Sequence, residues 1–229
     1  MAEQYPIISC ICITYNRPKF LHRAIICFIE QNYPNKELVI SYPKTDLITK
    51  QIIDSFSNLS LNILEVQRKE TEPLGNARNL AIDKCHGSYV CMWDDDDWYH
   101  ASRLSYQYNS MKTSGTGFQA SVLSRILLYD STTKKSYLSF DYTWDGSLLC
   151  RKEIIYQNQY AHIEKAEDTH IIKFLDFNKL LYHIEDSPFL YIYIYHGENT
   201  WDYKHYEYFL DKSELLNDEV TETIQKLLE

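Results

Sequence analysis

The sequence predicts an α/β fold, in which a mostly parallel sheet carries helices on both faces beside a small antiparallel element and a C-terminal helix. Short apolar runs rich in β-branched residues alternate with amphipathic stretches through about the first hundred residues. Strand-like runs around polar turns then replace this alternation, and the chain ends in an acidic amphipathic stretch. Repeated strand and helix alternation is typical of a parallel sheet covered by helices.

The first half of the chain supplies the strands and helices of this sheet. The segment "IISCICIT" has the length and β-branching of a buried strand, and Pro18 suits the first turn of the helix that follows. The expected strands are residues 7–14, 37–40, 61–66 and 88–93. The expected helices begin at Pro18, Asp46 and Asn76. The apolar residues expected on the inner face of the second helix are Ile48, Ile52, Ile53 and Phe56.

The second half departs from this rhythm. Residues 121–140 are typical of two strands around a polar turn at 130–135, which indicates an antiparallel element. A helix is expected to begin at Glu167 or Asp168, and apolar strands are expected at 179–184 and 189–196. The tail is predicted to be a helix that docks on its own domain or on a dimer partner, because basic residues are nearly absent from its polar face. Its apolar side holds Leu215, Leu216, Val220, Ile224, Leu227 and Leu228.

Length, composition and charge exclude several classes of protein. At 229 residues, with 45% apolar and 24% charged residues, the chain fits one soluble globular core. The formal net charge of −9 argues against nucleic acid as a partner, so a bound nucleotide should be small and helped by metal. No window approaches ~18 apolar residues, and the start lacks the basic region of a signal peptide, so we expect a cytoplasmic protein. The six cysteines show no CxxC spacing and are predicted to be reduced and buried.

Four consecutive aspartates in "MWDDDDWYH", residues 92–100, indicate a functional site. Two carboxylates about 4 Å apart repel by about 4 kcal/mol at an effective dielectric near 20, so a fixed cluster of them requires a cation. These aspartates follow an apolar strand, and open α/β sheets bind ligands at the carboxyl ends of their strands. Extended geometry would place Asp94 and Asp96 on one side, and Asp95 and Asp97 on the other. Such a D-x-D pair suits Mg²⁺ or Mn²⁺; the alternative is a solvated strand end.

Two segments resemble the inverting nucleotide-sugar glycosyltransferases of family 2, whose Rossmann-like fold is named GT-A. They are "ISCICITYNRPKFLHRAIICFIEQNYPNKELVI" and "PLGNARNLAIDKCHGSYVCMWDDDDWYH". The resemblance is well ordered from about Pro6 to His100 and looser to about Tyr203. It implies a domain at 1–210, with a nucleotide-binding half before about residue 100 and an acceptor half after it, followed by a C-terminal helix at 211–229.

The resemblance assigns the aspartates to the donor and metal site. In the family, the D-x-D pair binds the divalent ion that bridges the diphosphate of the donor. Asp96 would therefore bind Mn²⁺ or Mg²⁺ directly, with Asp97 as a supporting contact. Asp94 and Asp95 would belong to the donor-binding set. His196, in "YHGEN" after an apolar strand, would be a further metal ligand; a strand-end histidine with internal partners is the alternative.

Two further motifs are similar to the nucleotide-binding parts of the family. The residues that would meet the base and ribose are Thr14, Tyr15, Asn16 and Arg17, in the loop after the first strand. The alternative is a helix start with Thr14 or Asn16 as its N-cap. In "LGNARN", Gly75 suits a helix start whose N–H groups attract anions. Arg78 would reach the nucleotide or an adjacent acid, and a surface ion pair is the alternative.

One segment departs from the family pattern. Family members have an acidic pair after the second strand, and its first Asp contacts the base. This chain has Ser41, Tyr42 and Pro43 there instead. Tyr42 would stack on a base in place of that contact, because Asp46 lies too far along the chain to substitute.

The acceptor half contains the expected catalytic base. An inverting transfer needs a group that takes the proton of the acceptor hydroxyl. The family supplies it from an E-D pair that opens a helix, and the match at Glu167 and Asp168 makes Asp168 the expected base. An N-cap carboxylate is the alternative. Residues 144–147, "WDGS", resemble an acceptor-side loop, on which Trp144 would either cover a sugar face or pack in the core.

The resemblance therefore implies an enzyme that moves a sugar, with a UDP-sugar favoured, to a hydroxyl of a carbohydrate or lipid-linked acceptor with inversion. Bacterial cell-surface polysaccharide synthesis in the cytoplasm, at the inner membrane face, is the expected setting. The Q-x-x-R-W motif of processive synthases is missing, so addition of a single sugar is expected. The rivals are a nucleotidyltransferase, whose Gly-rich first loop is not found after "ICIT", and a non-catalytic sugar-nucleotide or protein-binding module of the same fold.

Overall fold

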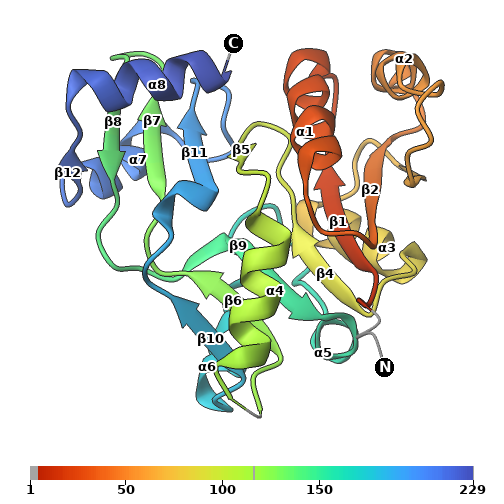
Figure 1. Ribbon diagram of the computed structural model, residues 1–229. Helices are drawn as coiled ribbons and strands as arrows, with labels where there is room; N and C mark the ends of the chain where they lie inside the picture. Colours follow the sequence, from red (N-terminus) through yellow and green to blue (C-terminus); the bar gives the residue numbers. More distant parts are fainter. Residues whose placement is uncertain (1–4, 116, 229) are drawn as a thin grey trace.

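Two sheets organise the chain in the computed structural model, which describes residues 5–115 and 117–228 (Figure 1). The first residues of the predicted domain and the last residue of the predicted tail helix lie outside the described residues. The larger sheet has seven strands in the order β10-β6-β9-β4-β1-β2-β3. These strands are β1 (Ile8–Ile13), β2 (Lys36–Pro43), β3 (Ile63–Arg68), β4 (Tyr89–Met92), β6 (Ala120–Leu123), β9 (Trp144–Arg151) and β10 (Leu181–Ile184). Within it only β9 runs antiparallel to its described neighbours, so the predicted parallel architecture is confirmed.

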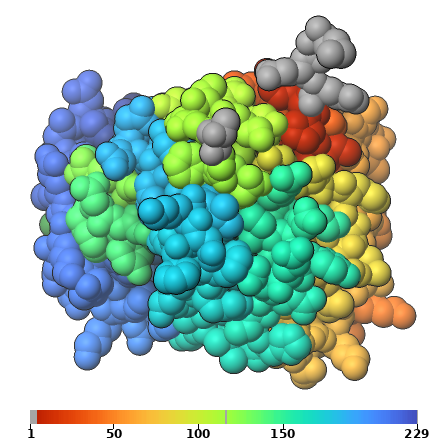
Figure 2. Space-filling model, turned by 90° about the horizontal axis from the view of Figure 1, so that it is seen from below, coloured from red at the N-terminus to blue at the C-terminus, as the bar shows by residue number. Residues whose placement is uncertain are grey.

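Helices cover both faces of this sheet, as predicted. They are α1 (Pro18–Glu30), α2 (Leu47–Ser55), α3 (Leu74–Lys84), α4 (Arg103–Thr113), α5 (Lys152–Gln157) and α6 (Thr169–Phe177). On β1, Cys10 and Cys12 pack in the core under α1, α2 and α4, whereas Ile11 packs in the second core under α3, α5 and α6. Alternate side chains of one strand therefore fill two cores. Seen from below, α4, α5 and the α6–β10 segment pack side by side at one end of the molecule (Figure 2).

The second sheet contains the predicted antiparallel element. Its five strands have the order β12-β8-β7-β11-β5, and β7 pairs with β8 around the polar turn. They are β5 (Trp98–Tyr99), β7 (Leu127–Asp130), β8 (Lys135–Leu138), β11 (Tyr191–Tyr195) and β12 (Glu214–Leu215), with the 3-10 turn η1 (Pro188–Leu190) before β11. Helix α7 (Tyr203–Leu210) and helix α8 (Asp218–Leu228) complete the chain. Helix α8 packs against β8 of its own chain, one of the two predicted docking places.

Several expectations for individual segments were wrong. Residues 121–123 belong to the large sheet, and residues 144–147 form the start of β9 rather than a loop. Ile48 is exposed on α2, because Asp46 caps this short helix and turns Thr49 and Ile53 inward. The tail begins with β12, and its expected apolar side is divided: Ile224 is buried, whereas Leu215, Val220 and Leu227 are exposed.

The structure also bears on the expectations for the cysteines and for a membrane-spanning segment. All six cysteines are free and buried, as predicted, and burial raises the pKa of the Cys10 and Cys12 thiols well above the ordinary value. Within the described residues, no helix has the length and apolar character needed to cross a membrane.

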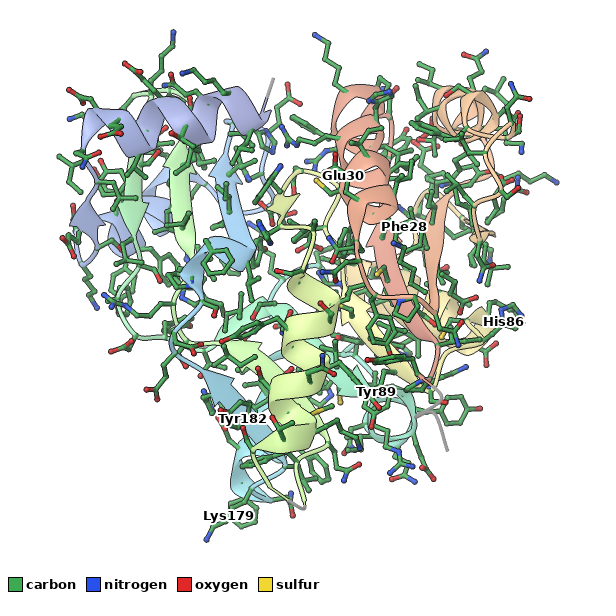
Figure 3. All side chains as sticks on the ribbon, viewed as in Figure 1. Phe28, Glu30, His86, Tyr89, Lys179 and Tyr182 are labelled. Carbon is green, nitrogen blue, oxygen red and sulfur yellow. The ribbon has the colours of Figure 1, made fainter. Side chains whose placement is uncertain are left out.

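A buried carboxylate fastens the amino ends of the central strands. Glu37 accepts hydrogen bonds from Ser9 Oγ at 2.6 Å and from the backbone N–H groups of His86 and Gly87 at 2.6 and 3.2 Å. The His86 ring, in the loop between α3 and β4, contributes a further contact through Nδ1 at 2.9 Å (Figure 3). Burial opposes ionisation, but these hydrogen bonds outweigh it and hold the pKa of Glu37 below its ordinary value of 4.5. Glu37 thus ties β1, β2 and the β4 loop together.

We predict that Glu37→Gln lowers the free energy of unfolding by about 2 kcal/mol at pH 7, since two backbone N–H groups and Ser9 lose a charged acceptor. Because folding lowers this pKa, the stabilisation is present above about pH 4.5 and is lost as the pH falls through the folded value. The difference between variant and wild type in urea denaturation should therefore shrink below about pH 4. Glu30→Gln, at an exposed position, is the control; an E37Q deficit that stays constant down to pH 3 would contradict this.

Candidate active site

A cavity of about 430 Å³ lies at the carboxyl end of β4, between the two halves of the chain. The four aspartates lie on its wall, and Arg78 and Asp168 line it from α3 and from the start of α6. The acidic turn of residues 94–97 follows β4 and leads into β5, which pairs with β11. The cavity therefore lies where the large sheet gives way to the small one.

The aspartates do not alternate as an extended strand would, and that expectation was wrong. The chain leaves the sheet after Met92 and turns, so Asp95 and Asp96 approach the same guanidinium. Arg17 Nη1 donates to Asp95 Oδ1 at 3.2 Å and to Asp96 Oδ2 at 2.8 Å. Asp94 instead accepts from Arg78 Nη2 at 3.1 Å.

Asp97 is fixed to the small sheet. Its carboxyl accepts hydrogen bonds from the Tyr191 hydroxyl at 2.5 Å and from the Ile194 backbone N–H at 2.9 Å, both on β11. Burial, with the charges of Asp96 and Asp94, raises the pKa of Asp97 well above its ordinary value. The observed contacts of Asp97 thus anchor the acidic turn.

The two central aspartates differ in their electrostatics. Burial raises the pKa of Asp95 to about 7, and the neighbouring charge of Asp96 adds to this. Burial also opposes ionisation of Asp96, but a hydrogen bond from His196 and the charge of Arg17 outweigh it and hold the pKa of Asp96 below its ordinary value. Of these two carboxyl groups, Asp96 is therefore the one whose ionised form is favoured.

The structure brings two of the four residues of "TYNR" to the acidic turn. Thr14 Oγ1 donates to Asp95 Oδ2 at 2.6 Å, and Arg17 reaches Asp95, Asp96 and the Glu198 carbonyl. Tyr15 is exposed, and its hydroxyl donates to Glu70 at 2.5 Å.

Asn16 has a different place. It adopts a positive φ of 53°, and its backbone N–H donates to Asp46 at 2.6 Å. The N-cap of α1 is Arg17, without a side-chain capping bond, so capping by Thr14 or Asn16 is excluded.

The expectation that Tyr42 stacks on a base was wrong. Strand β2 continues to Pro43, beyond its predicted end, and this places Ser41, Tyr42 and Pro43 inside the sheet. Tyr42 is 1% exposed, packs in the core, and donates its hydroxyl to Glu65 at 2.5 Å. It does not line the cavity.

Arg78 joins the two sets of acids. It is buried, and its Nη1 lies 2.6 Å from Glu167 Oε1 and 3.9 Å from Asp168 Oδ2, while Nη2 contacts Asp94. Burial opposes its charge, but Asp94 and Glu167 raise the pKa of Arg78 far above the ordinary value, so it stays protonated. Of the two predicted partners of Arg78, the adjacent acid is the one observed, and the surface ion pair is excluded.

Helix α3 is held against the 161–168 loop by a close backbone approach. A Cβ at Gly75 would lie 1.8 Å from the Ala161 carbonyl oxygen, so only glycine fits. The Gly75 N–H donates to Ile163 O, and the Leu74 N–H donates to Glu164. The N–H groups of Leu74 and Gly75 therefore have internal partners, and anion binding at this helix start stays a prediction.

Asp168 occupies the N-cap position of α6, but its side chain makes no capping hydrogen bond. The N-cap alternative therefore does not describe the carboxylate, which lies on the cavity wall near Arg78. Glu167 is buried and carries the stronger contact to Arg78. The pair thus separates into a buried partner of Arg78 and a carboxylate that faces the cavity.

Asp96 and His196 offer the chemistry of a divalent-cation site. His196 Nε2 lies 3.0 Å from Asp96 Oδ2, the oxygen that Arg17 also contacts. Among residues 5–115 and 117–228, no group of three or more His, Cys, Asp or Glu side chains converges on a metal-sized site. A carboxylate and an imidazole nevertheless suit Mn²⁺ or Mg²⁺ when substrate phosphates complete the shell, so the donor set fits such an ion.

Sequence reasoning missed part of the cavity wall. Tyr142, Trp201, His205 and Phe209 line it together with the expected Trp144. Only the abundance of aromatic residues signalled them, and half-buried strands explained that composition equally well.

Comparison with known families agrees with the fold. Residues 9–173 match the family described as Glycosyl transferase family 2, so the chain belongs to that family. A curated relative named for teichuronic acid biosynthesis, the glycosyltransferase TuaG of Bacillus subtilis, is 25% identical over 118 residues. That alignment covers 52% of this chain and 47% of TuaG, so the chain spans about half of the relative's length.

Solved structures support the GT-A fold. S. aureus TarS 1-349 in complex with UDP-GlcNAc has a TM-score of 0.68 at 17% identity, over 84% of this chain and 60% of that one. The mannosyltransferase PcManGT of Pyrobaculum calidifontis, in complex with GDP-Man and Mn²⁺, has a TM-score of 0.59 at 16% identity, over 84% and 57% of the two chains. These likenesses establish the fold.

We predict that Arg78→Met lowers the free energy of unfolding by about 3 to 5 kcal/mol, because it leaves buried Glu167 and half-buried Asp94 without their cation. Urea denaturation at pH 7 measures the effect. Arg151→Met, at an exposed arginine, is the matched control and should change stability by less than about 0.5 kcal/mol. Equal stability of R78M and wild type would show that Arg78 does not neutralise these acids.

Proposed function

We propose that this glycosyltransferase moves a sugar from a nucleotide-diphosphate donor, with a UDP-sugar favoured, to an acceptor hydroxyl with inversion. One observation carries the proposal: a single cavity holds the acidic turn on one side and the uncapped carboxylate of Asp168 on another, with Arg78 between them. An inverting transfer requires such a pair, a site for the leaving diphosphate and a base for the incoming hydroxyl.

The donor would bind at the acidic turn. Asp96 and His196 would hold Mn²⁺ or Mg²⁺, and the bound ion would neutralise charge on the leaving diphosphate. The solved neighbours in complex with UDP-GlcNAc and with GDP-Man and Mn²⁺ support a nucleotide-sugar donor and a divalent ion. Arg17 would supply a second positive charge at the same carboxylates, and Thr14 orients Asp95.

Asp168 would act on the acceptor. As the acceptor oxygen forms its bond to the anomeric carbon, its proton passes to the Asp168 carboxylate, and the bond to the diphosphate breaks on the opposite face of the sugar. Arg78 holds Glu167 at 2.6 Å and thereby fixes the chain next to this carboxylate. In this proposal Asp96 and Arg17 act at the leaving diphosphate, and Asp168 acts at the attacking hydroxyl.

The names of the relatives support a biological setting for this proposal. TuaG is named for teichuronic acid biosynthesis, which supports synthesis of a bacterial cell-surface polysaccharide. A carbohydrate or lipid-linked acceptor is proposed with it. In this proposal residues 1–210 form the transferase domain, 211–229 form the C-terminal segment, and the enzyme works in the cytoplasm at the inner membrane face.

We predict that Asp96→Asn and Asp168→Asn each lower the release of free nucleotide diphosphate by at least about 100-fold, since one removes a ligand of the proposed cation at the leaving diphosphate and the other removes the base. The assay uses a panel of UDP-, GDP- and dTDP-sugars with Mn²⁺. Asp83→Asn, an exposed carboxylate paired with Lys84, is the control and should retain turnover. Undiminished turnover in either site variant would sink the mechanism, whereas a wild type inert toward every donor would favour a non-catalytic binding module.

Chelation provides an independent check of the cation. Calorimetric titration of UDP should show at least about tenfold weaker binding in excess EDTA than with Mn²⁺, because the diphosphate then meets the carboxylates of the turn without a bridging ion. Titration of GDP and dTDP in parallel identifies the base. Equal affinity for all three nucleotides with and without Mn²⁺ would count against a metal-bridged donor site.

A further inference from the structure

One part of the cavity wall is not used by the donor or by the base. Tyr142, in the segment before β9, and Trp201, before α7, both line the cavity and are 44% and 36% exposed. Asp145, on β9, lines it between them and the acids. Large aromatic side chains exposed on a cavity wall are typical of a ligand-binding surface.

Neighbouring rings contact both exposed ones, and those beside Tyr142 are buried. Tyr142 packs edge-on against Trp144 and Phe209, with ring centroids 5.3 and 5.4 Å apart, and these two buried rings contact each other at 5.0 Å. Trp201 stacks on His205 with centroids 4.2 Å apart and planes 20° apart. The aromatic surface therefore has its orientation fixed before any ligand binds, which reduces the entropy cost of binding.

Two polar groups beside these rings have no partner among the described residues. The Asp145 carboxyl makes no hydrogen bond and no ion pair in the part of the chain that the structure describes. Trp144 is 7% exposed, and its Nε1 has no hydrogen-bond partner there either. Burial, followed by the charge of Asp168, raises the pKa of Asp145 to about 7. The half-buried Asp145 carboxyl is therefore available to accept hydrogen bonds from a ligand in the cavity.

We propose that Tyr142, Asp145 and Trp201 form the binding site for the acceptor, and that the acceptor presents a sugar ring there. This inference rests on the proposed glycosyl transfer. A sugar ring has apolar C–H faces that pack on aromatic rings, and hydroxyl groups that donate to a carboxylate, which is the combination that this wall offers.

Charge favours an uncharged sugar ring over a phosphate at this position. Asp145 faces Asp168 and Glu167, and Arg78 is already held by Glu167 and Asp94. A phosphate would therefore meet several carboxylates here, and among the described cavity-lining residues the exposed Lys165 would be the one lysine or arginine without an ion-pair partner. Lys165 Nζ lies over the Trp201 ring, 4.7 Å from the ring centroid. Because Lys165 is exposed, a sugar ring that displaces this cation–π contact would lose only about 0.5 to 1 kcal/mol.

The test uses the full chain and saturation-transfer difference NMR with octyl glycosides of glucose, galactose, mannose and N-acetylglucosamine as probes. We expect transfer to the ring protons of at least one glycoside with wild type, and at least about tenfold weaker binding with Asp145→Asn and Trp201→Ala. Trp201→Phe should recover most of the binding, because it restores an aromatic face. Asp83→Asn is the matched control and should bind like wild type.

The outcomes separate this inference from the proposed function. Calorimetric binding of UDP with Mn²⁺ verifies that D145N and W201A are folded. Normal nucleotide release by wild type, with no transfer to any sugar ring, or with transfer that D145N and W201A leave unchanged, would overturn the acceptor site alone. Transfer confined to the octyl chain would overturn it in favour of lipid recognition. Loss of glycoside binding in both variants, in a protein that releases no nucleotide, would support the site and reject the transferase mechanism.

Discussion

The rest of the structure depends on the cost of holding four carboxylates at the end of one strand. At an effective dielectric near 20, each close pair is repelled by about 4 kcal/mol, more than any surface contact returns. The protein meets this cost by giving each acid different partners. Arg17 takes Asp95 and Asp96, Arg78 takes Asp94, and β11 takes Asp97 through a hydroxyl and a backbone N–H. Contacts from Arg17, Arg78 and β11 therefore hold the acidic turn in place.

A further cation beneath the turn extends this arrangement into the core. Arg103 is fully buried, and its guanidinium lies 4.3 Å from the ring centroid of Tyr99 and 5.2 Å from that of Tyr191. It opposes the burial-driven rise in the pKa of Asp94, and it donates to the Gly146 carbonyl on β9 at 3.3 Å. Arg103, whose charge acts on Asp94, thus also contacts β9 next to Asp145. Arg103 therefore acts on the proposed donor side through its charge near Asp94 and on the proposed acceptor side through the Gly146 carbonyl.

The sequence predicted the central sheet well because its strands carry strong local signals. The β-branched run at β1, the apolar run at β4 and the proline at the start of α1 need no tertiary information. Tyr42 was misplaced because the end of β2 depends on pairing with β3, which extends through Pro43, and not on the residues of β2 alone. Strand β9 was mistaken for a loop because "WDGS" has no strand pattern of its own; β6 and β4 on either side recruit it.

The site residues show the same difference between local sequence signals and tertiary contacts. Thr14, Arg17 and Asp168 were predicted from local signals, because each lies at the end of a predicted strand or beside the start of a predicted helix. Contact of Arg78 with an adjacent acid was also predicted, but its contact with Glu167 depends on Gly75 allowing α3 to touch the 161–168 loop. Because Arg78 is shared by Asp94 and Glu167, the donor side and the base side are energetically one unit. A change that alters the charge at Asp94 alters the grip of Arg78 on Glu167, and hence the position of Asp168 beside it. In the proposed mechanism, binding of the leaving group and placement of the base would therefore be coupled through Arg78.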